Sequence, residues 1–174
     1  MKNLKAFQLN FGSLADGNHT FQYHIDSDFF ENFENSLLQT ADIQVKLSLH
    51  KTYNLLTLDF ELVGTIQAPC DICTEPVDIR VDTTDTLLVK LISEELESDR
   101  PDVIYLIQGS TQVDISQHLY ELVSLSLPMR RTHPEDENGV PTCDPAVLKH
   151  IQNHPANADQ QPSNPIWDAL KNLK

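Results

Sequence analysis

The sequence is poor in basic residues and in glycine. Its 174 residues include 12 Lys+Arg against 26 Asp+Glu, which gives a formal net charge of -14 and a pI of about 4.6. Proteins that bind nucleic acid unaided usually present a basic face, so this balance argues against extensive phosphate contacts and favours a basic partner. The five glycines stand apart from one another and form no phosphate-binding loop.

Long apolar runs are missing as well. The sequence holds no stretch of about 18 apolar residues, the length that a membrane-spanning helix requires. Its first residues include Lys2 and Lys5 but not the apolar core of a signal peptide. We therefore expect a cytoplasmic protein without a membrane partner, and no small-molecule substrate is evident.

Alternation of apolar and polar residues predicts a mainly antiparallel β-sheet. The pattern is clearest over residues 43–49 and 56–62, on either side of a turn near 51–54. A hairpin around Gly109 and Ser110 is also expected. Further alternating segments at residues 77–92, 103–107 and 112–115 bring this sheet to about five strands, and residues 20–25 form a separate predicted strand before it. The fold class is therefore α+β, with an antiparallel sheet or partly open barrel and flanking helices.

Two amphipathic helices are expected to cover the sheet. The first carries an apolar stripe that starts at Phe29, after a capping box formed by Asp28 and Glu31. The second follows Asp114 and ends at Pro128. We expect residues 1–151 to form a single α+β domain, with a short helix at 146–151.

The C-terminal residues predict a linker followed by a separate helix. Residues 152–164 are rich in Asn, Gln, Pro, Ser and Asp, a composition typical of flexible segments. Residues 165–174 then place Ile166, Trp167 and Leu170 along one side of an amphipathic helix. This helix could dock on its own domain, or these three residues could anchor it in a groove of a partner.

Cys70 and Cys73 form a Cys-x-x-Cys motif at a predicted strand reversal. Two cysteines at this spacing supply half of a tetrahedral metal site. Cys143 and His133, ten residues before it, complete a Cys3His set suited to zinc. His150 and His154 are alternative fourth ligands.

Two other interpretations of the cysteines remain open. A single Cys-x-x-Cys without a second one is a weak zinc signature, so all three residues could be reduced thiols without a ligand. Thiol redox chemistry is disfavoured because the motif lies between strands, whereas a reactive thiol usually lies at a helix start that lowers its pKa.

The remaining polar residues indicate no catalytic site. His19, His24, His50 and His118 are unclustered and are expected on the surface. The adjacent pair Arg130-Arg131 is expected to be solvated, since two arginines supply few of the contacts that bind a phosphate backbone. We therefore predict a protein that is not an enzyme.

Three separated motifs resemble those of the YceD-type family, described as large ribosomal RNA subunit accumulation proteins. The first is Val63-Gly64-Thr65 leading to Cys70-Asp71-Ile72-Cys73. The second ends in Leu125-Ser126-Leu127-Pro128, and the third is Asn164-Pro165-Ile166-Trp167-Asp168-Ala169-Leu170. Asn164 and Ile166 stand where the family usually has Asp and Arg.

The resemblance implies a role in accumulation or assembly of the large ribosomal subunit. With five basic and thirteen acidic side chains, residues 43–115 would be a poor platform for RNA. We therefore expect contact with a basic ribosomal or assembly protein, and with ribosomal RNA only indirectly or within a complex. The alternative is a zinc-stabilised protein-interaction module unrelated to ribosomes.

Overall fold

The computed structural model describes residues 4–34, 36, 38, 40–93, 102–137, 139 and 141–153. The chain divides into two compact units, residues 1–132 and residues 133–174. The first unit contains the sheet and its core, and the described part of the second contains a loop and one helix.

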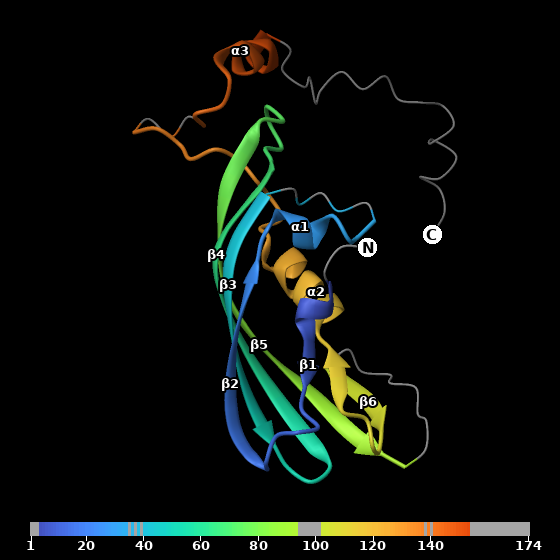
Figure 1. The fold of residues 1–174 in the computed structure, drawn as a ribbon. Coiled ribbons are helices and arrows are strands. Elements are labelled where there is room, and N and C mark those ends of the chain that lie inside the picture. Colours follow the sequence, from blue (N-terminus) through green and yellow to red (C-terminus); the bar gives the residue numbers. More distant parts are fainter. Residues whose placement is uncertain are drawn as a thin grey trace, which may run out of the picture. The chain divides into compact units, whose positions relative to one another are not determined.

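A five-stranded mixed sheet dominates the first unit, which confirms the predicted α+β class (Figure 1). Neighbouring strands follow sequence order, and the first three junctions are antiparallel. The strands are β2 (Gly17–Ile25), β3 (Thr40–Lys51), β4 (Leu55–Pro69), β5 (Pro76–Ile92) and β6 (Val103–Ile107).

The hairpin expected around Gly109 is wrong. The strand β6 pairs with β5 in parallel, over Leu88–Ile92. The next strand, β7 (Gln112–Asp114), pairs instead with β1 (Gln8–Asn10) in a separate two-stranded sheet. This pairing sets Val113 opposite Leu9 and buries both, so an apolar contact distant in sequence prevails over a local turn.

The core lies between one face of the sheet and the helices of the first unit. Figure 1 shows α1 (Ser27–Phe30) and α2 (Ser116–Ser126) on the same side of the sheet. Alternate residues of β3 and β4, such as Leu47 and Phe60, are buried against them. The 3-10 helix η1 (Leu4–Phe7) adds Phe7 to this core. Period-two alternation therefore identified the buried face correctly.

The first helix is shorter than expected and begins differently. The N-cap is Asp26, whose carboxylate accepts a hydrogen bond from the Phe29 N–H, so the predicted capping box of Asp28 and Glu31 is wrong. The helix spans only one turn, and its Phe29 and Phe30 are both buried. The second helix agrees with the prediction, ending just before Pro128.

The described part of the second unit contains α3 (Pro145–Asn153), which confirms the helix predicted at 146–151. Most of the predicted linker lies outside the described residues, together with the helix that carries Ile166, Trp167 and Leu170. None of the described helices is long and apolar enough to cross a membrane.

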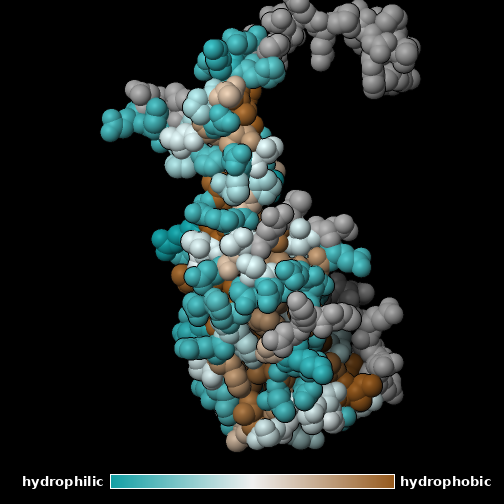
Figure 2. All heavy atoms as spheres, turned by 45° about the horizontal axis from the view of Figure 1, so that its top comes forward, coloured by the Kyte–Doolittle hydropathy of each residue, from teal (hydrophilic) through white to brown (hydrophobic). Residues whose placement is uncertain are grey.

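The surface is mostly polar on the face drawn in Figure 2, where hydrophobic residues form small patches. A few large apolar side chains are nevertheless well exposed. Among the described residues they include Tyr53, Leu125 and Met129. Single exposed apolar residues are normal, so only those that border a groove carry functional information.

Candidate metal centre

The Cys-x-x-Cys motif forms the turn between β4 and β5. These strands continue beyond the last pair of β3 with β4, so the turn lies at the end of a long hairpin (Figure 1). The Cys70 carbonyl accepts a hydrogen bond from the Thr74 N–H, and the Cys70 N–H donates to the Glu75 carbonyl. Thr74 has a φ of 63°, an uncommon conformation for a residue with a side chain, which the tight reversal requires.

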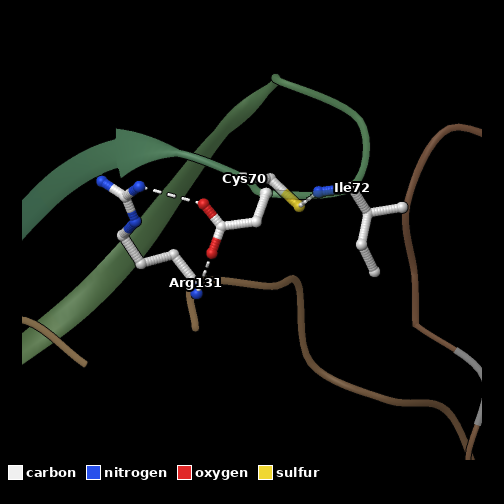
Figure 3. Close-up of polar contacts among 4 residues, drawn as sticks. Cys70, Ile72 and Arg131 are labelled. Atoms are coloured by element: carbon white, nitrogen blue, oxygen red, sulfur yellow. Dashed lines mark hydrogen bonds and ion pairs between the residues drawn. The ribbon is translucent and has the colours of Figure 1, made fainter. Parts of the chain in front are cut away.

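Both cysteine side chains of this turn are buried, and neither forms a disulfide. The Ile72 N–H points at the Cys70 sulfur, with nitrogen and sulfur 3.4 Å apart (Figure 3). Contacts of this kind from outside the ligand set orient a metal ligand. The turn therefore presents two buried thiols that form half of the candidate Cys3His set.

Asp71, between the two cysteines, binds Arg131 through three hydrogen bonds. Its carboxylate accepts from the Arg131 backbone N–H at 2.7 Å and from the guanidinium at 2.9 Å (Figure 3). Its own N–H donates to the Arg131 carbonyl at 2.7 Å. The hydrogen bond from the Arg131 backbone N–H lowers the pKa of the Asp71 carboxyl; burial, the next effect in size, opposes this shift, and the guanidinium adds to the lowering. We call this contact the Asp71–Arg131 pair.

The second pair of candidate ligands lies in the second unit. His133 Nδ1 and Cys143 Sγ are 3.7 Å apart, and Cys143 is buried. The loop between them closes on itself, since the Thr142 N–H donates to the Pro134 carbonyl and Glu135 forms a bridge with Pro141. A spacing of ten residues therefore brings the two ligands together.

The described residues thus include a Cys3His set that could bind a metal ion: Cys70, Cys73, His133 and Cys143. Three thiols and one imidazole match the donors of closed, structural zinc sites. The set is the one that the sequence predicted. Of the alternative ligands, His150 lies in α3 and is not in this set, and His154 lies outside the described residues.

One expectation about polar residues holds in part and another was wrong. Arg130 is exposed as expected, whereas Arg131 is half-buried and forms an ion pair with Asp71. His118 has a side chain only 13% exposed, because it packs on Phe60 beside Asp85. Neither could be recognised from spacing, since both contacts join segments that are distant in sequence.

Burial lowers the pKa of His118, and the charges of Asp85 and Glu121 partly oppose this shift. The Nε2 atom of His118 lies 3.0 Å from an Asp85 carboxylate oxygen. This contact with the carboxylate is one of the effects that oppose the lowering of the pKa by burial.

Comparison with known proteins gives one match. The sequence model of the family described as "Large ribosomal RNA subunit accumulation protein YceD" matches residues 58–174, which is more than half of the chain. The matched region includes all four residues of the Cys3His set. No curated protein and no solved structure shows significant similarity to the chain.

Proposed function

The chain belongs to the YceD family, and we propose that it is a non-catalytic factor that supports accumulation of the large-subunit ribosomal RNA. The family match carries this proposal. The net charge of -14 supports action through protein contacts, because phosphate backbones repel an acidic surface. We further propose that it acts in the cytoplasm, on a basic ribosomal or assembly protein.

A structural zinc ion held by Cys70, Cys73, His133 and Cys143 is part of the proposal. The chemistry of the donors supports it, since a Cys3His set binds zinc through soft thiolates and a neutral imidazole. The Asp71–Arg131 pair gives further support. It holds Arg131, two residues before His133, against Asp71, which lies between Cys70 and Cys73 in the turn.

The ribosomal role is tested by measuring rRNA in cells that lack the gene. We expect a lower ratio of large-subunit to small-subunit rRNA, restored by the wild-type gene. An unchanged ratio would refute the proposal. If zinc were still bound in that case, the chain would fit the alternative of a zinc-stabilised interaction module unrelated to ribosomes.

The zinc ion is tested by elemental analysis of the purified protein. We expect about one zinc per chain, reduced strongly by Cys70→Ser and by His133→Ala. His150→Ala is the matched control, because this histidine lies in the same unit outside the ligand set. If zinc were lost with His150→Ala and kept with His133→Ala, His150 would be the fourth ligand in place of His133. Purified protein without any metal would rule the site out.

A further inference from the structure

A groove in the first unit lies between α2 and the sheet, beside β5. It has a volume of about 230 Å³ and is separate from the Cys3His set. We call it the α2 groove. Its lining residues are Asp85, Asp102, His118, Glu121, Leu122 and Leu125.

The α2 groove combines an apolar wall with carboxylates. Leu119 and Val123 face the core, whereas Leu122 is half-buried and Leu125 is 83% exposed at the end of the same helix. Lining residues Asp102 and Glu121 are exposed. An exposed leucine beside acidic side chains is suited to a ligand that is both apolar and basic.

Asp85 occupies an unusual position for a carboxylate. It pairs with Phe60 in the register of β4 and β5, so it lies on the face of the sheet that is otherwise buried. Its side chain is nevertheless 42% exposed, and it borders the α2 groove. One carboxylate oxygen of Asp85 lies 3.0 Å from His118 Nε2, and a carboxylate with two oxygens keeps further acceptor capacity for a cationic ligand.

We propose that the α2 groove binds a basic segment of a partner protein, with an apolar side chain of that segment against Leu122 and Leu125 and its lysine or arginine groups at Asp85, Asp102 and Glu121. The inference deepens the proposed function, because it gives the proposed basic partner a binding surface. The volume is below the range of about 300–1,000 Å³ typical of small-molecule sites, which favours one or two side chains over a metabolite.

Charge complementarity favours this occupant over the alternatives. RNA would bring phosphates to three carboxylates. Residues 94–101 of the same chain carry four acidic side chains and one arginine, so they match the groove poorly. Residues 165–174 carry two lysines and one aspartate, a smaller positive charge than a basic partner offers.

Binding is tested with a labelled peptide of alternating lysine and leucine residues and the full-length protein, by fluorescence anisotropy. The inference requires affinity that falls as salt rises, and much weaker binding when serine replaces leucine or glutamate replaces lysine in the peptide. Equal binding of the serine peptide would overturn it, because charge alone would then account for the interaction.

Variants locate the binding site. Leu125→Ser should weaken binding at least about fivefold, and Glu121→Gln about two- to fivefold. The matched controls are Tyr53→Ser, which removes an equally exposed apolar side chain, and Asp16→Asn, which removes an exposed charge elsewhere. Equal losses in variants and controls would overturn the assignment.

Backbone NMR of the same samples distinguishes a bound peptide from the chain's own C-terminal segment as the occupant of the α2 groove. The peptide should shift amide signals of α2 and of β5 near Asp85, and Trp167→Ala without peptide should leave those signals unchanged. Shifts caused by Trp167→Ala would overturn the inference in favour of the chain's own C-terminal segment.

The cellular test distinguishes this inference from the proposed function. In cells that lack the gene, Leu125→Ser with Glu121→Gln should fail to restore the rRNA ratio that the wild type restores. Full restoration by this double variant would overturn the groove and leave the ribosomal role intact. If the rRNA ratio does not depend on the gene at all, the ribosomal role is refuted. The peptide experiment would then still show whether the α2 groove binds a basic segment.

Discussion

Asp71 joins the Cys-x-x-Cys turn to the chain that leads into the second unit. Its carboxylate accepts from the Arg131 backbone N–H and guanidinium, and its own N–H donates to the Arg131 carbonyl. Residues that hold metal ligands in place usually contribute to metal affinity without touching the ion. The Asp71–Arg131 pair has the geometry for that role, next to both thiols of the turn.

Arg131→Ala is therefore expected to lower zinc affinity by about tenfold, at the low end of the effect usual for such supporting residues. The loss stays modest because the backbone bonds of residue 131 do not need its side chain. Competition with a chromophoric chelator measures it. Arg130→Ala is the matched control, and equal affinity in the two variants would show that the guanidinium has no positioning role.

His118 predicts a pH dependence of stability. Burial lowers the pKa of His118 from the usual 6.5. At pH values between the two pKa values, the unfolded chain therefore binds a proton that the folded chain does not bind. Stability should therefore fall as pH drops below about 6.5, down to the lowered pKa of the folded state. The nearby carboxylates of Asp85 and Glu121 reduce the effect without reversing it.

Urea unfolding between pH 5 and 8 tests this expectation, with saturating zinc so that metal release does not contribute. The profile of His118→Gln should be flatter than that of the wild type below pH 6.5. His24→Gln is a suitable control, since this histidine is half exposed on β2. Parallel profiles for wild type and His118→Gln would contradict the assignment.

At the scale of elements, Gly64 allows β3 and β4 to lie close together. A Cβ atom at this position would come within 2.6 Å of Ile43 Cα, and closer still to the Asp42 carbonyl oxygen. Both contacts are with backbone atoms, so no side-chain rotation relieves them. The glycine is therefore required by the packing of the paired strand, which the sequence motif alone did not explain.

Gly64→Ala should destabilise the fold by about 1–3 kcal/mol, the usual cost of adding a methyl group to a packed site. Chemical denaturation measures the loss. Val63→Ala is the neighbouring control, because this side chain is half exposed and leaves the backbone contact unchanged. Equal stability of Gly64→Ala and wild type would show that the strands can separate at little cost.

Element prediction succeeded where the pattern is local and failed where pairing is distant. The hairpin of β3 and β4 follows from alternation on both sides of one turn, and α2 from its stripe and Pro128. The parallel pairing of β6 with β5 could not be inferred, because no short-range pattern records which strand edge is free. The first helix is shorter than its apolar stripe predicted. Its two aromatic residues, Phe29 and Phe30, are part of the core.

At the scale of the molecule, the candidate Cys3His set could be named from the sequence, with His150 and His154 as alternative fourth ligands, and the contacts around it could not. Cysteine spacing and the chemistry of zinc point to these residues. The contacts of Asp71 with Arg131 and of His118 with Asp85 arise only when residues separated by many positions meet. For the same reason, the acidic excess predicted a basic partner but could not predict where on the surface it would bind.

The proposed zinc ion would also couple the two units. If Cys70 and Cys73 of the first unit and His133 and Cys143 of the second share one ion, the metal supplies free energy that links them. The first unit has a large apolar core of its own, whereas none of the residues of α3 is buried. Metal removal should therefore affect the second unit far more than the first.

Hydrogen exchange with and without a strong chelator tests this coupling. Amides of residues 133–153 should lose protection when zinc is removed, and those of β3 and β4 should keep it. Cys143→Ser should reproduce the loss without chelator, because it removes the one thiol of the second unit. If protection fell equally in both regions, zinc would stabilise the whole fold; unchanged protection in 133–153 would mean that the ion does not join the units.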